Sequence, residues 1–361
     1  MDVTELLAQA VKAGASDLHL AAGESPMLRL DGELRRLDLP PLEPAVLREG
    51  LVRLLEWASQ PWADKARELD VALDLPGLGR FRLNLSEQLK GLAACLRVIP
   101  SRVPTLDELG LEEVFRLIAR FNSGLVLVGG PTGSGKSTSL AALVDRLNRE
   151  CPLHIITLED PIEIIHCSQR SLVNQREVGR HTRDFAQGLR SALRQDPDVI
   201  LIGELRDLET IRLALRAAET GHLVLATVHT RSAAGSIDRL VEAFAAEEKV
   251  LVRTMLAESL RVVVSQQLVK RIGGGRVAAR EVLVATPAVR NLIREGRLAQ
   301  LHSAMQSGAG AGMQTLGAAL QGLLAQGLVS PEQAQALGAG QRLARRRPPG
   351  CSLGSTRLAT T

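Results

Sequence analysis

The residues from Gly130 to Thr138 have the types and the spacing that bind phosphate groups. They follow a short apolar run at 125–128 and precede apolar residues repeated at helical spacing. In a strand, turn and helix of this kind, backbone N–H groups surround phosphate oxygens, and the positive end of the helix faces the same anion. We expect Lys136 to meet the β- and γ-phosphates and the Ser137 hydroxyl to meet Mg²⁺, which predicts a site for ATP or a close relative. The predicted nucleotide-binding residues are Gly130, Pro131, Thr132, Gly133, Ser134, Gly135, Lys136, Ser137 and Thr138.

Carboxylates follow two further predicted strands. Three of them lie between 159 and 163 after the strand at 154–158, and Glu204 follows the strand at 199–202. Ligands of an open α/β sheet bind beyond the carboxyl ends of its strands, and phosphoryl transfer to water requires Mg²⁺ and a carboxylate that orients or deprotonates the water. We expect the Glu204 strand to neighbour the phosphate-loop strand, so that Glu204 holds Mg²⁺ through water, activates the attacking water, or does both. Glu163 is the competing candidate for the general base.

His229 follows a fourth predicted strand, at 223–227. Its imidazole could contact the γ-phosphate and pass the signal of hydrolysis to the next element, although a lone histidine is more often structural. His222, just before that strand, is expected to hydrogen-bond within the core.

Three arginines lie on strands predicted in the first hundred residues. Arg80 and Arg82 alternate with Phe81, Leu83 and Leu85, so the arginines share one face of their strand. That face is either solvated or lies over the nucleotide, where its charge would stabilise the transition state as an arginine finger does. Arg97 is a third candidate for this role, and the role requires two domains that close on one another.

The pattern of apolar residues predicts an α/β chain with two domains. Residues 1–100 form an α+β domain, 101–112 a linker, 113–338 a P-loop core with C-terminal helices, and 339–361 a tail. In the first domain, the expected helices are 3–13 and 43–58, and the expected strands are 18–20, 27–30, 69–75, 80–85 and 92–99. In the second, the four strands named above alternate with helices expected at 136–148, 182–195, 207–219, 232–245 and 248–267. Small helices are expected after these, with a mobile loop at 308–312.

The composition and the distribution of charge limit the kinds of molecule that we expect this chain to bind. The net charge of +4 comes from the tail, because its five arginines leave 39 basic against 40 acidic residues in the body. The tail is expected to be solvated and disordered, and contact with anionic lipid is the weaker alternative. The neutral body and the 2% aromatic content count against a nucleic-acid partner. No signal peptide or spanning segment is evident, so we expect an intracellular protein, soluble or peripheral to a membrane.

Together these residues resemble the secretion ATPases of type II and type IV pilus machines, and most of all their twitching-motility, or pilus-retraction (PilT-like), branch. The segments that carry the resemblance are 15–20, 79–82, 130–138, 157–163, 173–177, 196–207, 217–222, 227–230 and 288–295. The last of these, Ala-Val-Arg-Asn-Leu-Ile-Arg-Glu, differs by one conservative change from the signature of that branch. The segments 165–170 and 179–181 depart from the commonest retraction enzymes, and the tail has no counterpart.

The resemblance implies a PAS-like N-terminal domain and a RecA-like ATPase domain, assembled as a homo-hexameric ring in the cytoplasm, peripheral at the inner membrane. ATP hydrolysis with Mg²⁺ around the ring would turn an inner-membrane platform protein and disassemble the pilus. Arg80, Arg82 and Arg97 would reach nucleotide at domain and subunit boundaries. The segment 288–295 would serve retraction, or would simply be an amphipathic helix. The alternative function is a low-turnover, nucleotide-gated accessory subunit of a retraction complex, working beside a paralogous retraction ATPase.

Overall fold

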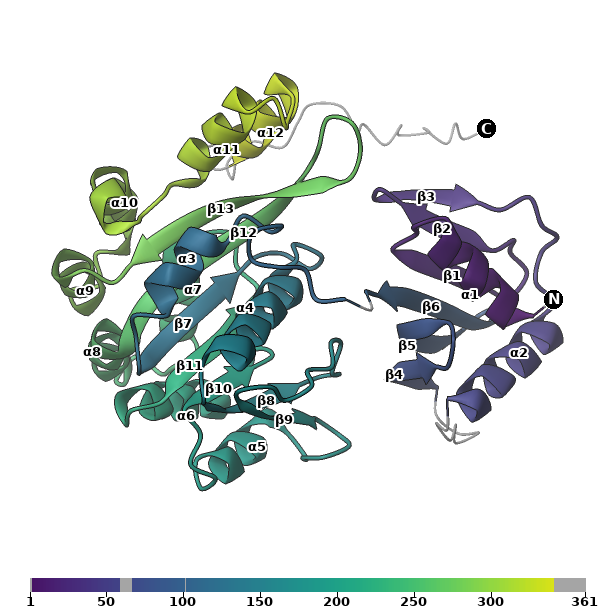
Figure 1. Ribbon diagram of the computed structural model, residues 1–361, viewed down its shortest axis with the longest axis horizontal. Coiled ribbons are helices and arrows are strands. Elements are labelled where there is room, and N and C mark those ends of the chain that lie inside the picture. The colour runs from purple at the N-terminus through teal and green to yellow at the C-terminus, as the bar shows by residue number, and fades with distance from the viewer. Residues whose placement is uncertain (1, 59–66, 101, 341–361) are drawn as a thin grey trace, which may run out of the picture.

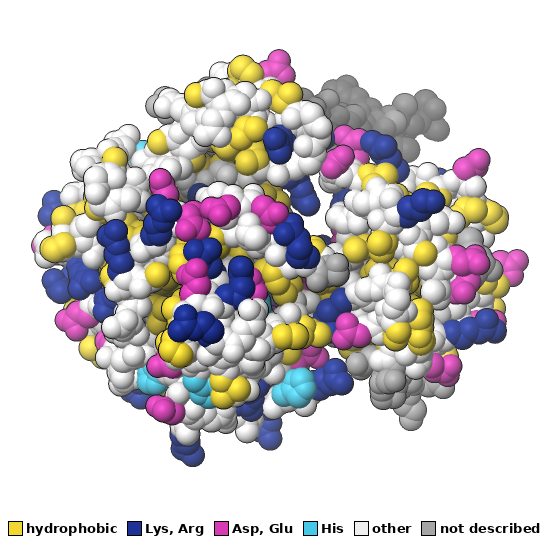
Figure 2. Space-filling model, viewed as in Figure 1, with side chains coloured by type: hydrophobic (Ala, Val, Ile, Leu, Met, Phe, Trp, Pro, Cys, Tyr) yellow, Lys and Arg dark blue, Asp and Glu magenta, His cyan; other side chains and the backbone are white. Residues whose placement is uncertain are grey.

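The computed structural model describes residues 2–58, 67–100 and 102–340 and contains two β-sheets, each with its own helices (Figure 1). The N-terminal sheet and the larger sheet lie side by side, joined by the segment after β6. Over the face shown in Figure 2, basic and acidic side chains are interspersed on both domains. Within these ranges no helix is long and apolar enough to cross a bilayer.

The N-terminal domain is an antiparallel sheet covered on one face by two helices. Its strand order is β3-β2-β1-β6-β5-β4. Its elements are α1 (Val3–Lys12), β1 (Asp17–Ala21), β2 (Met27–Leu30), β3 (Glu33–Arg36), α2 (Pro44–Trp57), β4 (Glu68–Leu75), β5 (Gly79–Gln88) and β6 (Gly91–Ile99). The Asp2 carboxylate caps α1 by accepting from the Thr4 N–H, and leucines of α1 and α2 pack on the sheet. These elements match the expected helices and strands, apart from β3, for which no strand range was predicted.

The other face of this sheet is polar because side chains alternate along each strand. On β5, Phe81, Leu83 and Leu85 are fully buried against the helices. Arg80 and Arg82 therefore project from the opposite face, and the pairing of β5 with β6 places Arg97 directly beside Arg82.

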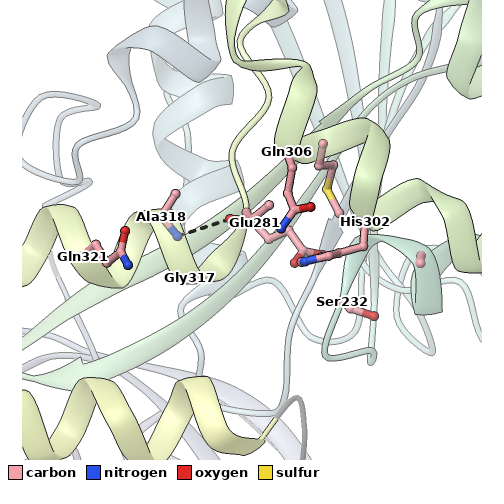
Figure 3. A pocket seen from close by; sticks show the side chains of 10 residues that line it. Ser232, Glu281, His302, Gln306, Gly317, Ala318 and Gln321 are labelled. Carbon is pink, nitrogen blue, oxygen red and sulfur yellow. Dashed lines mark hydrogen bonds between the residues drawn. The ribbon is translucent and has the colours of Figure 1, made fainter.

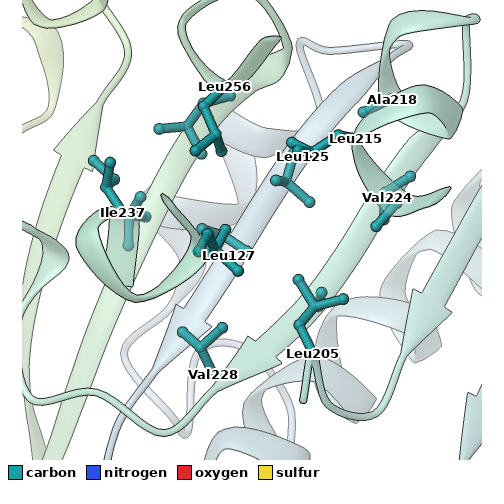
Figure 4. Packing of buried hydrophobic residues seen from close by; sticks show 14 of the residues in the cluster. Leu125, Leu127, Leu205, Leu215, Ala218, Val224, Val228, Ile237 and Leu256 are labelled. Atoms are coloured by element: carbon teal, nitrogen blue, oxygen red, sulfur yellow. The ribbon is translucent and has the colours of Figure 1, made fainter. Parts of the chain in front are cut away.

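The second domain is built on a seven-stranded sheet of order β13-β12-β7-β11-β10-β8-β9. All neighbouring strands from β12 to β9 pair in parallel, and β13 is an antiparallel edge. Hydrophobic clusters on both faces bury the sheet, and Figure 4 shows one of them around Leu125 and Leu127. The strands are β7 (Gly124–Gly129), β8 (His154–Glu159), β9 (Leu172–Glu177), β10 (Val199–Ile202), β11 (Leu223–Val228), β12 (Leu260–Lys270) and β13 (Arg276–Val284).

Helices cover both faces of this sheet. They are α3 (Glu112–Ile118), α4 (Lys136–Glu150), α5 (Phe185–Ala192), α6 (Leu208–Glu219), α7 (Ala233–Glu242) and α8 (Lys249–Ser259). The Asp184, Asp207 and Ser232 side chains each accept from an N–H of the following helix, which explains where α5, α6 and α7 begin.

The helix predicted at 248–267 is wrong in its second half. The chain leaves the helix at Ser259 and continues as β12, which pairs with β7. A continuous apolar run does not distinguish a buried strand from a helix, and the consecutive valines 262–264 favour the strand. β13 and the edge strand β9 were also not expected, and the glycines 273–275 mark the hairpin turn between β12 and β13.

Small helices follow β13, as expected. They are α9 (Pro287–Arg294), η1 (Leu298–Gln300), α10 (Leu301–Ser307), η2 (Ala309–Ala311), α11 (Leu316–Ala325) and α12 (Pro331–Gly340). The segment 288–295 contains most of α9, whose Val289 and Ile293 are fully buried, so this helix is amphipathic. The loop expected at 308–312 contains η2. The arginine-rich tail lies outside the described residues.

Candidate nucleotide site

The phosphate loop connects the end of β7 to the start of α4. Gly135, in the left-handed region at φ 85°, precedes α4, and no side chain of the described residues caps this helix. The N–H groups of its first turn are therefore available to an anion. Gly130 has φ 156°, and a Cβ there would lie 2.3 Å from Ser134 Oγ, so only glycine fits.

Lys136 lies inside this loop. Its Nζ donates to the carbonyl oxygens of Gly130 at 2.8 Å and Pro131 at 3.0 Å, and the residue is 8% exposed. Burial lowers the pKa of Lys136, while the nearby charges of Glu204 and Glu163 act in the opposite direction. The structure thus brings both predicted carboxylates close enough to the Lys136 ammonium to influence its proton.

The order of strands corrects one expectation. β10, which ends before Glu204, does not neighbour β7, because β11 lies between them. Along the carboxyl edge the order is therefore the phosphate loop, His229, Glu204 and the loop after β8. His229 Nε2 accordingly lies 3.4 Å from Glu204 Oε1. The sequence predicts where strands end but contains no direct signal for their lateral order.

Glu204 is held in a short chain of charged groups. Arg206 Nε donates to Glu204 Oε2 at 2.5 Å, and Arg206 Nη1 lies 4.0 Å from Asp160 Oδ2. Thr227 Oγ1 donates to the Gly203 carbonyl, which fastens the segment before Glu204 to β11. Asp160 and Glu204, from two strand ends, are thus linked through one arginine.

The loop from Asp160 to His166 is shaped by two side chains of β9. Gln175 donates from Nε2 to the Ile164 carbonyl at 2.8 Å and accepts from the His166 N–H at 2.7 Å. Glu177 accepts from the Ile162 N–H at 3.0 Å. Because these bonds bracket Glu163, Gln175 and Glu177 position it. In the sequence, Gln175 and Glu177 are separated by one residue, as side chains on one face of a strand would be. The residue types alone do not predict that they position Glu163.

Glu159 differs from the other carboxylates of its loop. Its Oε1 accepts from Thr157 Oγ1 at 2.6 Å and from Gln175 Nε2 at 3.1 Å. Burial raises the pKa of Glu159, and these two hydrogen bonds only partly oppose that effect. Glu159 is therefore a half-buried carboxylate that supports the loop.

Two arginines of the N-terminal domain contact the loop from Asp160 to His166. Arg80 Nη2 donates to the Ile162 carbonyl at 2.8 Å, and Arg82 Nη1 lies 3.3 Å from Glu163 Oε1. Arg82 also donates to Asp70 from Nε at 3.0 Å and Nη2 at 2.8 Å. The interpretation of their sheet face as a purely solvated surface is therefore wrong for Arg80 and Arg82.

Arg97 and His222 do not contact the loops at this edge. Arg97 Nε instead donates to the buried Asp17 carboxylate at 2.9 Å, on the same sheet face as Arg82. His222 Nδ1 lies 3.0 Å from the Ala217 carbonyl, at the end of β11 opposite His229. The expected hydrogen bonding of His222 is thus present.

Two of the cavities that the described residues form lie beside the second domain. One of about 560 Å³ lies between the N-terminal domain and the loop after β8, where Arg80 and Glu163 both line it. The other, of about 700 Å³, lies among α10, α11, β13 and the start of α7, and its lining includes Glu281, His302 and Gln306 (Figure 3). Only the first lies beside the carboxylates described above.

A glycine-rich loop and an uncapped helix at the carboxyl edge of a largely parallel sheet, with glutamates on neighbouring strand ends, define a RecA-like P-loop nucleotide-binding domain. A family model described as "Type II/IV secretion system protein" matches residues 1–274, and the chain belongs to this family.

Similar proteins agree with this assignment. The chain is 56% identical over 335 residues to the type IV pilus retraction ATPase PilT of Pseudomonas aeruginosa, covering 93% of this chain and 97% of that one. It is 50% identical over 312 residues to a twitching motility protein of Neisseria gonorrhoeae, covering 86% and 83%. A crystal structure of the pilus retraction motor PilT with bound ADP matches with a TM-score of 0.80 and 43% identity, over 93% and 97% of the two chains. The expected family and fold class are confirmed.

Replacing Glu159 with Gln should stabilise the protein at neutral pH. The glutamine keeps an acceptor for Thr157 and removes the half-buried charge, so we expect Tm to rise by roughly 2–4 °C, as about 1 kcal/mol would produce. Because the folded-state pKa lies above the ordinary value of 4.5, the gain should be complete above the folded pKa and should shrink as pH falls towards 4.5. Thermal unfolding from pH 4.5 to 8 measures this. The exposed Glu68→Gln is the control, and a gain independent of pH would contradict the prediction.

Proposed function

We propose that this chain is a hexameric ATPase motor that hydrolyses ATP to drive retraction and disassembly of a type IV pilus, and so twitching motility. The observation that carries the proposal is that the phosphate loop with Lys136, Glu204 beside His229, and Glu163 beside Arg82 of the N-terminal domain all follow strands of one sheet at its carboxyl edge. The relatives named as a retraction ATPase and a twitching motility protein support the direction of the motor.

In this proposal the residues 130–138 bind the triphosphate. Lys136 would move its ammonium from the loop carbonyls to the β- and γ-phosphates. Glu204 or Glu163 would take the proton of the attacking water, and His229, in contact with Glu204, would sense the γ-phosphate.

The residues present also fit a magnesium ion. Ser137 is exposed at the start of α4 and Glu204 is half-buried at the same edge of the sheet. The described part of the chain has no group of three or more His, Cys, Asp or Glu residues that would hold a metal unaided. This is typical of Mg²⁺, which keeps several waters and uses substrate phosphates together with one or two protein groups. We assign Ser137 and, through water, Glu204 to this ion, which would neutralise phosphate charge.

The three arginines would add positive charge from the N-terminal domain. Arg80 and Arg82 are already held at the loop that contains Glu163, from the same chain. Arg97 shares their sheet face and would need to leave Asp17 to reach a phosphate. Domain closure is therefore part of the proposed catalytic cycle.

The proposed assembly is a homo-hexamer at the cytoplasmic face of the inner membrane, acting on a platform protein and with a paralogous retraction ATPase as a further partner. We do not expect direct binding of nucleic acid. The proposed domains are residues 1–100, a linker at 101–112, the ATPase domain at 113–338, and a basic tail from 339.

We expect Lys136→Ala to reduce phosphate release to background and to weaken ATP binding, because the loop then lacks its only charge for the phosphates. The exposed Lys90→Ala is the control. Unchanged turnover of Lys136→Ala would defeat the assignment of the site.

We expect a comparison of kcat between two variants to identify the carboxylate that acts as the general base. Glu204→Gln and Glu163→Gln keep the shape of each side chain, and loss of a general base lowers kcat by roughly 10²- to 10⁴-fold. Steady-state phosphate release by both variants, with ADP affinity as the control for binding, shows which residue acts. If neither lowers kcat tenfold, both assignments fail. A wild-type chain that binds ATP but hardly hydrolyses it would favour the accessory subunit.

We expect Arg82→Ala to lower turnover by roughly 10²- to 10³-fold while sparing ATP affinity more than Lys136→Ala does, since its charge would act on the transition state. Arg53→Ala, which removes an exposed arginine from α2, is the matched control. Turnover equal to that of the wild type would mean that Arg82 acts only in the contact between the two domains.

The direction of the motor can be tested in cells. Deletion of the gene should give hyperpiliated cells that do not move on surfaces, because pili would still assemble but would not retract. Pilus counts by electron microscopy and surface motility measure this. Bald cells would point to pilus assembly instead.

A further inference from the structure

Gln266 of β12 contacts the phosphate loop with both its main chain and its side chain. Its amide Nε2 donates to the Ser134 carbonyl at 2.6 Å, and its Oε1 accepts from Ser139 Oγ at 3.0 Å and from Arg280 Nε at 2.9 Å. The residue is 2% exposed. Its carbonyl oxygen also lies so close to Gly130 that a Cβ there would be 2.5 Å away. Gln266 therefore contacts Gly130 and Ser134 of the phosphate loop and Ser139 of α4.

The sheet register explains this placement. β12 pairs with β7 so that Ser265 lies opposite Gly129, which leaves Gln266 level with the first residue of the loop. The pairing of β12 with β13 places Arg280 directly opposite Gln266. Val262 and Val264 pack in the same cluster as α4, so the side chain of Gln266, two residues further on, points to the face that α4 covers.

Arg280 is a buried cation, 9% exposed, and among the described residues no carboxylate pairs with it. Its Nε donates to Gln266 and its Nη1 to the Gly110 carbonyl at 3.3 Å. Burial lowers the pKa of Arg280 to about 10. A guanidinium has donors only, so the side chain of Gln266 must present its oxygen to Arg280 and its NH₂ group to Ser134.

The bond to Ser134 also sets the direction of a neighbouring donor. The Ser134 C=O and the Gly135 N–H belong to one trans peptide plane and point in opposite directions. When Gln266 binds the carbonyl, the Gly135 N–H must point away from Gln266. If the Gln266 amide were flipped, its oxygen would face the Ser134 carbonyl oxygen. The hydrogen bond that orients the Ser134–Gly135 peptide would then be lost.

We propose that Gln266 and Arg280 are positioning residues for nucleotide binding: Gln266 holds the phosphate loop in its binding shape, and Arg280 fixes the orientation of the Gln266 amide. This inference rests on the nucleotide site of the proposed function, and it requires no hydrolysis. Neither residue would touch the nucleotide.

Calorimetric titration of the full-length chain with ADP and Mg²⁺ tests the proposal. Gln266→Met removes all three side-chain hydrogen bonds at similar volume, and we expect the Kd for ADP to rise about tenfold or more. Arg280→Met frees the amide to flip, because the Ser139 hydroxyl can accept as well as donate, so a smaller rise is expected. Arg280→Lys keeps a group that only donates and should remain within about threefold of wild type.

Two further variants separate positioning from stability. Gln267→Met is the matched control on the same strand, since this neighbouring side chain points to the other face and should leave Kd unchanged. Gln266→Met alone leaves Arg280 buried without its acceptor and should lower Tm, whereas the double variant Gln266→Met/Arg280→Met removes both polar groups and should regain Tm. The double variant should still bind ADP weakly.

Wild-type Kd in Gln266→Met, or recovery of Kd together with Tm in the double variant, would overturn the proposal, because the two residues would then act only on stability. A wild-type chain that binds ADP but does not hydrolyse ATP would overturn the proposed motor function instead. The comparison of dissociation constants would remain valid in that case.

Discussion

The parallel pairing of β7, β11, β10 and β8 is the constraint on which the candidate site depends. Parallel strands all finish at one edge of a sheet, so residues separated by up to about a hundred positions in the chain meet there. The phosphate loop, His229, Glu204 and the Glu163 loop are brought together by this geometry. Without this parallel pairing, these loops and residues would not form a common site.

Much of this arrangement could be predicted from the sequence. The phosphate loop, the glutamates at strand ends and the alternation of arginines with buried residues on β5 each follow from local pattern. The order of the strands could not be predicted, because lateral pairing depends on contacts between distant segments. For the same reason Glu204 was expected one strand nearer to β7 than it is.

β12 and β13 show a second limit of sequence reasoning. A short apolar run such as 262–264 is compatible with both a helix and a strand, and only its pairing with β7 decides between them. Because the sequence does not predict this hairpin, it does not predict the contacts of Gln266 with the phosphate loop or of Arg280 with Gln266 either. Gln175 and Glu177 illustrate the same difficulty on the edge strand β9, where polar side chains carry little strand signal.

The β12–β13 hairpin links the phosphate loop of the second domain to its C-terminal helices. Val269 on β12 and Ala279 on β13 belong to a small hydrophobic core shared with α11 and α12. Gln314, just before α11, donates from Nε2 to the Arg280 carbonyl at 3.2 Å. Val269 lies three positions after Gln266, about 10 Å along the extended chain. One hairpin therefore contacts the phosphate loop through Gln266 and, a short distance along the same strand, packs against the C-terminal helices.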